Sequence, residues 1–286
     1  MTEQVQRTKV GIPQLLRLKA EGKKATWITA YDFPMAQFVD AAGIDMILVG
    51  DSLGNNVLGY TNTIPVTMEE MISHSSAVTR GSKYAFVIGD MPFMSYHISV
   101  EDAIRNAGRF VKEAKCDAIK LEGGKAVCDK VTAITRAGIP VFGHLGLTPQ
   151  SETMIGGLRV QATNAVDAKK LLDDALALEE AGAFALLVEA IPARVAQVVH
   201  NKLRIPVYGI GAGPHVDGQL LIFHDLFGLF QAYTPRFSKR YAEVGKMIVD
   251  GLTQYAKEVR DLEFPAREHQ FTIKKEELDK FLEIAG

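Results

Sequence analysis

The chain has 286 residues, of which 47% are hydrophobic and 23% are charged, and its formal net charge is −2. This composition is typical of a folded globular protein and excludes a disordered chain. A charge balance so close to neutrality gives no electrostatic basis for binding nucleic acid or an anionic membrane, so neither is expected as a partner. The length fits a single α/β barrel of about 250 residues, or two smaller domains.

The sequence predicts neither export nor insertion into a membrane. Residues 1–24 lack the apolar core of a signal peptide, and no run reaches the roughly 18 apolar residues that span a membrane. The two cysteines, Cys116 and Cys128, lack metal-binding spacing and are too few for a disulfide framework. We expect two free thiols in a reducing compartment and a soluble, cytoplasmic protein.

Short apolar runs alternate with helical segments along the chain. A helix predicted at residues 12–21 precedes the first run and is expected to cover the barrel bottom. The predicted strands are residues 25–30, 45–50, 84–89, 117–122, 139–143, 184–189, 205–210 and, most weakly, 226–230. Most of these runs are apolar throughout, which is typical of parallel strands buried on both faces.

The segments between the strands have helical spacing. Residues 101–115 follow Ser99, which is suited to cap a helix N-terminus. Residues 165–181 have a similar pattern, and Gly182 is placed to end that helix. Eight strands alternating with helices fit a closed (β/α)8 barrel or a doubly wound open sheet. The barrel is favoured because the strand count is eight and no linker divides the chain.

We therefore predict an α/β protein with the (β/α)8 TIM-barrel fold in one domain, residues 1–286. Its parts are an N-terminal helical cap (1–24), a barrel core (25–235) and a C-terminal helical extension (236–286). Within the extension, residues 272–284 predict a helix with Leu278, Phe281 and Leu282 on one stripe. Packing of this stripe against the barrel is the simpler interpretation, and a subunit contact is the alternative.

Four acidic residues follow predicted strands: Asp51, Asp90, Glu122 and Glu189. The carboxyl ends of barrel strands meet at one mouth, where catalytic groups gather. Any one of these acids alone would more often be a turn or capping residue, but four acids that each follow a strand favour a functional site. Converging carboxylates repel each other unless they are protonated, paired or bound to a cation. Oxygen ligands suit a hard ion, so the pattern predicts Mg²⁺.

Three further features lie near these acids. Lys120 lies on the same side of its strand as Glu122, where it could bind an anionic substrate, neutralise the acids or be a structural lysine. His144 either orients a loop or acts directly at the mouth. The segment GIGAG (209–213) resembles a phosphate-binding turn, but it lacks the spacing of a dinucleotide-binding motif, so close chain approach at strand 7 is the simpler interpretation.

Several segments together resemble the ketopantoate (3-methyl-2-oxobutanoate) hydroxymethyltransferase family. They are LVGDSLG (48–54), DMPFMSY (90–96), IKLEGG (119–124), GHLGLTPQS (143–151), GIGAG (209–213) and HDLFG (224–228). The resemblance runs from about Trp27 to His269. It implies transfer of a hydroxymethyl group from 5,10-methylenetetrahydrofolate to 3-methyl-2-oxobutanoate, giving 2-dehydropantoate in pantothenate biosynthesis through a Mg²⁺-stabilised enolate. It also implies a homo-oligomer, specifically a decamer.

The resemblance also implies roles for individual residues. Asp51 and Asp90 resemble the Mg²⁺ ligands, and Glu122 resembles a residue that meets the ion directly or through water. Asp51, Ser52 and Asp90 resemble contacts to the keto acid, and Lys120 resembles the contact to its carboxylate. Glu189 resembles the proton acceptor. The resemblance assigns no folate-binding residues.

The chain departs from the family pattern at two places. Family members carry a His shortly before Pro-Lys-Phe after strand 8, where this chain has Tyr233-Thr234-Pro235-Arg236-Phe237. The segment 156–162 ends in Ala162 where Gly is frequent. The first departure concerns contacts to folate, because Arg and Lys are not interchangeable at a shaped site.

Two other functions fit the same acids. One is a related Mg²⁺-dependent keto-acid C–C lyase or mutase, and the other is a non-catalytic keto-acid sensor. The separate carboxylate of Glu189 argues against a sensor, because binding alone does not need a further acid beside an anionic ligand.

Overall fold

The computed structural model describes residues 7–230 and 235–286 and contains a closed barrel of eight parallel strands. The strands are β1 (Ala25–Thr29), β2 (Met46–Val49), β3 (Phe86–Asp90), β4 (Ala118–Glu122), β5 (Val141–Gly146), β6 (Ala185–Glu189), β7 (Val207–Ile210) and β8 (Gly218–Leu221). Each strand pairs with the next along the chain, and β8 pairs with β1. The predicted (β/α)8 TIM barrel is confirmed.

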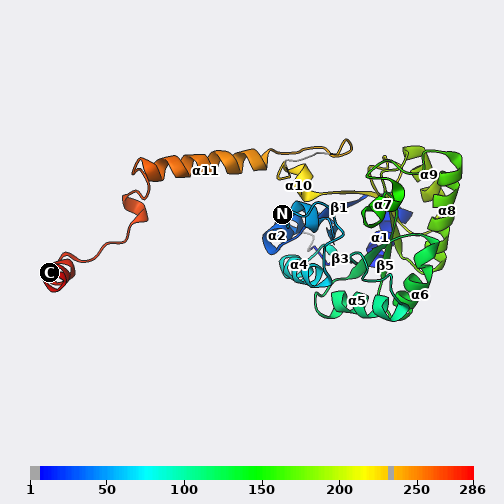
Figure 1. The fold of residues 1–286 in the computed structure, drawn as a ribbon, viewed down its shortest axis with the longest axis horizontal. Coiled ribbons are helices and arrows are strands. Elements are labelled where there is room, and N and C mark those ends of the chain that lie inside the picture. Colours follow the sequence, from blue (N-terminus) through cyan, green and yellow to red (C-terminus); the bar gives the residue numbers. More distant parts are fainter. Residues whose placement is uncertain (1–6, 231–234) are drawn as a thin grey trace, which may run out of the picture.

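Helices cover the outside of the barrel (Figure 1). The longer ones are α2 (Phe33–Ala41), α4 (Met68–Gly81), α5 (Val100–Lys112), α6 (Cys128–Arg136), α8 (Ala165–Glu180) and α9 (Ala193–Lys202), and α1 (Ile12–Ala20) precedes the first strand. Short helices at the strand ends are α3 (Leu53–Asn56), α7 (Glu152–Ile155) and α10 (Phe223–Leu226), and 3₁₀ turns occupy Lys125–Val127, Pro149–Ser151 and Arg267–His269. As predicted, Ser99 caps α5 by accepting a hydrogen bond from the Asp102 N–H, and Gly182 follows α8 with a φ of +103°.

The position predicted for the eighth strand was wrong. Residues 226–230 do not form a strand; β8 is Gly218–Leu221, and α10 follows it. Gln219, in the middle of β8, is exposed because the next long helix runs away from the barrel instead of back over the strand (Figure 1). A strand with one open face lacks the continuous apolar run that identified the other seven.

The N-terminal segment closes the bottom of the barrel. Val10 donates its N–H to the carbonyl of Tyr84, just before β3 begins, and Leu15 of α1 is 1% exposed. Both pack with the interior cluster around Trp27, whose ring centroid lies 4.6 Å from that of Phe142. The expected capping helix is confirmed, and Trp27 is a packing residue inside the barrel.

The C-terminal extension leaves the barrel as an arm (Figure 1). It consists of α11 (Val244–Arg260) and α12 (Lys275–Ala285). Gly245 is the buried residue of α11, and α12 has none. The interpretation that Leu278, Phe281 and Leu282 pack against the barrel was therefore wrong, because residues 261–274 carry α12 away from it and all three side chains are exposed.

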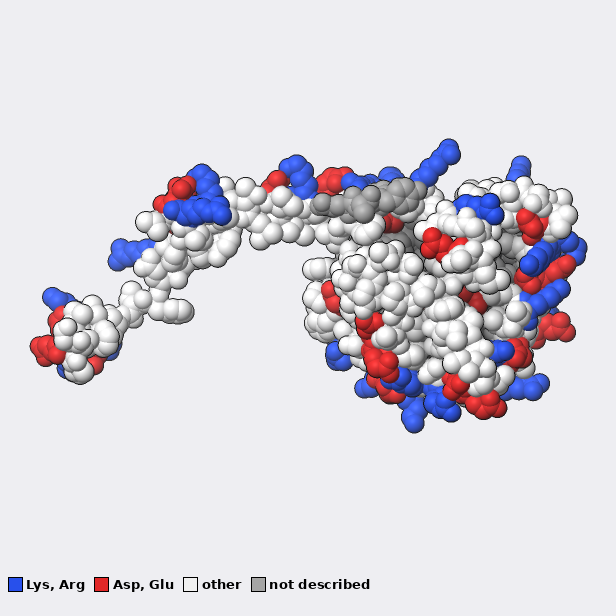
Figure 2. All heavy atoms as spheres, in the orientation of Figure 1, with Lys and Arg blue, Asp and Glu red and all other residues white. Residues whose placement is uncertain are grey.

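The surface has no strong bias of charge on the side in view. Figure 2 shows basic and acidic side chains interspersed over the outer helices of the barrel. Among the described residues, no helix combines the length and apolar character needed to cross a membrane. Cys116 and Cys128 are free thiols, as expected.

Candidate active site

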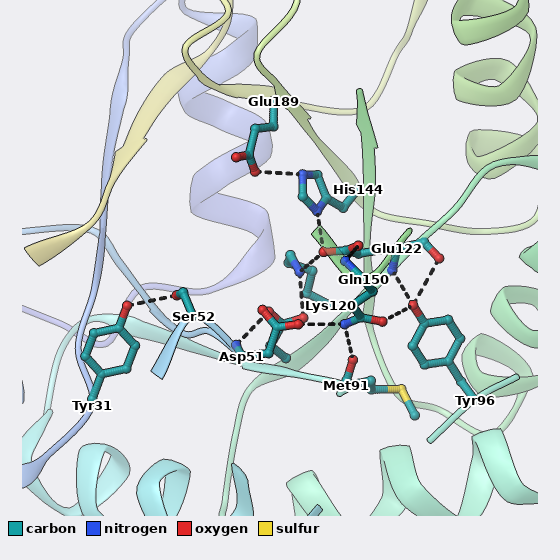
Figure 3. A network of polar contacts seen from close by, with 11 residues as sticks. Tyr31, Asp51, Ser52, Met91, Tyr96, Lys120, Glu122, His144, Gln150 and Glu189 are labelled. Carbon is teal, nitrogen blue, oxygen red and sulfur yellow. Dashed lines mark hydrogen bonds and ion pairs between the residues drawn. The ribbon is translucent and has the colours of Figure 1, made fainter. Parts of the chain in front are cut away.

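Polar side chains from five adjacent strands meet at the carboxyl mouth of the barrel. Asp51 follows β2, Asp90 ends β3, Lys120 and Glu122 lie on β4, His144 lies on β5 and Glu189 ends β6. They line one cavity of about 440 Å³ together with Ser52. The structure thus brings together all the predicted site residues. Figure 3 shows Asp51, Ser52, Lys120, Glu122 and Glu189 among them.

Lys120 is the buried cation at the centre of these acids. Its Nζ lies 2.6 Å from Asp90 Oδ1 and 3.7 Å from Glu122 Oε1, and the residue is 2% exposed. Burial lowers the pKa of Lys120, but the surrounding carboxylates raise it further, so the net shift is upward. The amine therefore stays protonated and neutralises part of the acidic charge.

His144 joins the acids of β4 and β6. Its Nδ1 lies 3.3 Å from Glu122 Oε1 and its Nε2 lies 3.2 Å from Glu189 Oε2, although neither contact is aligned as a hydrogen bond. Burial and Lys120 lower the pKa of His144, but Glu122 and Glu189 outweigh them and raise it to about 9. Of the two interpretations of this residue, the structure supports a position inside the site.

Sequence reasoning missed Gln150 and Tyr96, which connect the acids. The Gln150 amide donates to Asp51 Oδ2 and to the Met91 carbonyl, each at 2.9 Å, and its backbone N–H donates to Glu122 Oε2. The Tyr96 hydroxyl donates to Gln150 Oε1 at 2.7 Å (Figure 3). Both residues lie in segments that carried the family resemblance, but uncharged side chains gave no separate signal.

Ser52 contacts the buried Tyr31, which comes from the segment after β1. Its hydroxyl lies 2.9 Å from that of Tyr31, which is fully buried in the segment that follows β1 (Figure 3). This contact fixes the Ser52 hydroxyl beside Asp51.

The acidic residues carry more negative charge than their protein partners neutralise. Burial raises the pKa of Asp51 well above its ordinary value, and the charge of Asp90 raises it further. Burial also raises the pKa of Asp90, which Lys120 only partly offsets. By contrast, Lys120 and His144 overcome the effect of burial on Glu122, and its pKa is lowered. A divalent cation would remove the repulsion that remains around Asp51 and Asp90.

The donor set of carboxylate oxygens fits Mg²⁺. Mg²⁺ usually takes one or two protein carboxylates and fills its other positions with water and substrate oxygens. Asp51 and Asp90 adjoin each other, since the Asp51 N–H donates to Asp90 Oδ2 at 3.1 Å. Glu122 is already held by Lys120, His144 and Gln150. Within residues 7–230 and 235–286, no three acidic, histidine or cysteine side chains converge on a common metal position.

The mouth also depends on unusual backbone at the ends of β5 and β6. Gly146 has a φ of +94°, and a Cβ there would lie 2.3 Å from the Glu189 carbonyl oxygen. Ala190, directly after Glu189, has a φ of +46°. The glycine therefore allows the two strand ends to approach closely and fixes the position of Glu189.

The remaining sequence features have structural explanations. A Cβ on Gly211 would lie 2.7 Å from the Phe237 ring, and one on Gly213 would lie 2.4 Å from Ala193, which confirms that GIGAG allows close chain approach. Ala162 is buried at a φ of +55°, a left-handed conformation that Gly adopts without strain. Of the departing segment, Pro235, Arg236 and Phe237 line the cavity, and Tyr233 and Thr234 lie outside the described residues.

The fold and the site define a TIM-barrel enzyme with a buried acidic site at its carboxyl mouth. Phosphonopyruvate hydrolase shares this fold with a TM-score of 0.59 at 14% identity, covering 96% of this chain and 97% of that one. A 2,3-dimethylmalate lyase of the PEP mutase/isocitrate lyase superfamily gives a TM-score of 0.58 at 16% identity, covering 96% and 99%. At these identities the likeness shows the fold alone.

Sequence comparison identifies the family. The ketopantoate hydroxymethyltransferase family model matches residues 9–267. The 3-methyl-2-oxobutanoate hydroxymethyltransferase of Moorella thermoacetica is 53% identical over 93% of this chain and 99% of its own length. That of Syntrophomonas wolfei is 51% identical over 95% of this chain and 99% of its own length. The chain belongs to the ketopantoate hydroxymethyltransferase family and is a transferase.

Proposed function

We propose that the protein transfers a hydroxymethyl group from 5,10-methylenetetrahydrofolate to 3-methyl-2-oxobutanoate, giving 2-dehydropantoate for pantothenate biosynthesis in the cytoplasm. The relatives named for this reaction support it at about half identity over nearly the whole chain. The structural observation that carries the proposal is the division of the acids, with Asp51 and Asp90 around Lys120 and Glu189 apart beside His144.

The paired acids form the keto-acid side of the site. Asp51 and Asp90 would hold Mg²⁺, with Glu122 close to the ion directly or through a water molecule. When bound, Mg²⁺ polarises the keto oxygen and stabilises developing enolate charge. The protonated amine of Lys120 binds the substrate carboxylate, and Ser52 and Asp51 orient the keto acid.

Glu189 is the proton acceptor. It removes the C3 proton of the keto acid to give the enolate. Water adds to the methylene carbon of the donor and both of its C–N bonds break, which releases tetrahydrofolate and leaves a one-carbon unit at the oxidation level of formaldehyde. The enolate attacks this carbon, and the resulting alkoxide takes up a proton to give the hydroxymethyl group. His144, whose Nε2 lies 3.2 Å from Glu189 Oε2, holds the carboxylate in place.

The role of Glu189 can be tested without the donor. Wild-type protein with Mg²⁺ should exchange the C3 proton of 3-methyl-2-oxobutanoate in D₂O, as followed by NMR. Glu189→Gln should slow exchange by about 10²–10⁴-fold while retaining keto-acid binding. Glu152→Gln removes one carboxylate from the wall of the same cavity and serves as the matched control. Native exchange in Glu189→Gln would exclude it as the base.

The lyase or mutase alternative makes a different prediction. Such an enzyme would turn over the keto acid without a one-carbon donor. We expect 2-dehydropantoate only when both 5,10-methylenetetrahydrofolate and Mg²⁺ are present. Cleavage or rearrangement of the keto acid with the donor omitted would contradict the proposed function.

We also propose that the chain forms a homo-oligomer, for which the family resemblance suggests a decamer. The support in the structure is α11, whose side chains of Met247, Leu252 and Tyr255 are 68%, 62% and 55% exposed. A second copy of the chain would remove this apolar surface from water. Analytical ultracentrifugation should show that Leu252→Glu assembles less than wild type. Identical sedimentation of the two proteins would show that α11 is not part of the interface.

A further inference from the structure

The mouth of the barrel has two unlike sides. The groups proposed to act on the keto acid come from β2 to β6. On the other side, the cavity is lined by Ile210 of β7, Leu220 of β8 and Ile222, and then by Asp225 of α10. Among the described lining residues of that side, Asp225 is the acid.

Asp225 is a buried carboxylate without a hydrogen-bond donor among the described residues. It is 5% exposed, and no N–H or O–H group of residues 7–230 or 235–286 donates to its side chain. Burial raises the pKa of Asp225 to about 6, and the charge of Arg240 partly opposes this. A buried carboxylate is unfavourable unless a partner satisfies it, which points to a ligand that supplies donors.

The keto acid does not account for this part of the cavity. It has eight heavy atoms, whereas cavities of roughly 300–1,000 Å³ accommodate drug-sized ligands, and this one measures about 440 Å³. The keto acid is also an anion whose oxygens would repel a carboxylate. The apolar side next to Asp225 therefore has room for a second ligand, and the carboxylate suits one that carries N–H donors.

We infer that Asp225 binds the pteridine end of the folate donor, accepting hydrogen bonds from its ring N3–H and its 2-amino group. These two N–H groups lie side by side, and a carboxylate can accept both, as it does from a guanidinium. Leu220, Ile222 and Phe237 offer apolar contact to the ring. Arg159 and Arg236 line the same cavity and suit the anionic glutamate tail. This inference rests on the proposed function.

The first test uses calorimetry to measure the binding of the two ends of the donor separately. The probes are tetrahydrofolate, 6-methyltetrahydropterin and p-aminobenzoylglutamate, each added to the protein with keto acid and Mg²⁺. In Asp225→Asn, one acceptor becomes a donor, so the Kd values of tetrahydrofolate and the pterin should rise about 30- to 100-fold. The Kd of p-aminobenzoylglutamate should stay within threefold of wild type, and Glu152→Gln should behave as wild type with all three. An unchanged tetrahydrofolate Kd in Asp225→Asn, or equal losses for both fragments, would overturn the inference.

A ligand-side test does not depend on how the variant folds. A tetrahydropterin in which hydrogen replaces the 2-amino group should bind wild-type protein at least tenfold more weakly than the parent pterin. Equal affinity would overturn the inference. If wild-type protein makes 2-dehydropantoate but Asp225→Asn binds tetrahydrofolate normally, only the role of Asp225 fails. If wild-type protein forms no product but Asp225→Asn still weakens the binding of tetrahydrofolate and the pterin, the proposed function fails and the assignment of Asp225 stands.

Discussion

The hydrogen bonds of Gln150 provide a quantitative test of how the buried acids are held. Gln150→Met keeps the length of the side chain but removes its amide. The change breaks a charge-assisted bond to Asp51 and neutral bonds to Met91 and Tyr96, and it leaves Asp51 with one partner fewer. Hydrogen bonds to charged groups contribute about 1.5–3 kcal/mol and neutral ones about 0.5–1.5 kcal/mol. We expect the free energy of unfolding to fall by about 3 kcal/mol.

Tyr96→Phe should act partly through the same contact. It removes the hydroxyl that donates to Gln150 and accepts from the Glu122 N–H, so we expect a loss of about 2 kcal/mol. Because the double variant loses the shared bond only once, the two changes should be non-additive by about 1 kcal/mol.

Urea unfolding of wild type, the two single variants and the double variant measures this double-mutant cycle, with the fluorescence of Trp27 as the probe. Trp27 is the chain's single tryptophan and lies inside the barrel, so its emission reports on the barrel core. All four proteins must be compared at one concentration, since assembly contributes to apparent stability. Strict additivity, or a loss below about 1 kcal/mol for Gln150→Met, would refute the reasoning.

Three further changes test the scaffold. Leu15→Ala should lower stability by about 2–5 kcal/mol because Leu15 is 1% exposed. Leu16→Ala, at a position that is 42% exposed, should have little effect. Equal losses of stability in the two variants would contradict closure of the barrel by α1. Gly146→Ala forces a Cβ to within 2.3 Å of a backbone oxygen and should abolish exchange of the C3 proton of the keto acid. Gly138→Ala has a similar φ but open space around the Cβ, so it should only reduce stability by about 1 kcal/mol. Normal proton exchange in Gly146→Ala would contradict this steric argument. Burial raises the pKa of Asp40, but three backbone N–H groups and a serine hydroxyl lower it overall. Its stabilising contribution is therefore present above the unfolded pKa of about 3.9 and is lost as pH falls through the folded value. Asp40→Asn should lower stability by about 2 kcal/mol at pH 7, and the difference from wild type should shrink in acid unfolding below pH 4; a difference independent of pH would contradict this.

The sequence predicted the barrel well because buried parallel strands leave a clear pattern. Seven strands have apolar residues on both faces, and the acids at their ends identify the carboxyl mouth. β8 was missed because Gln219 faces open space where a covering helix is absent from the described structure. The path of α12 could not be predicted, because an amphipathic stripe does not specify which surface it packs against.

The site was predicted through its charges and missed where it is neutral. Asp51, Asp90, Lys120 and Glu122 stand out because charge is unusual at the end of an apolar run. Gln150 reaches Asp51 from a 3₁₀ turn 99 positions away in the chain. Contacts between residues so distant in sequence become visible only when the barrel closes.

The closed bottom of the barrel has a kinetic consequence. Val10, Leu15 and the aromatic side chains around Trp27 fill that end, so both proposed substrates would enter and leave through the carboxyl mouth. Asp51 and Asp90, which we propose meet the keto acid, are nearly inaccessible to solvent, and a larger molecule bound across the mouth would block access to them. We therefore expect an ordered mechanism in which the keto acid binds first, with excess donor acting as an inhibitor competitive with the keto acid.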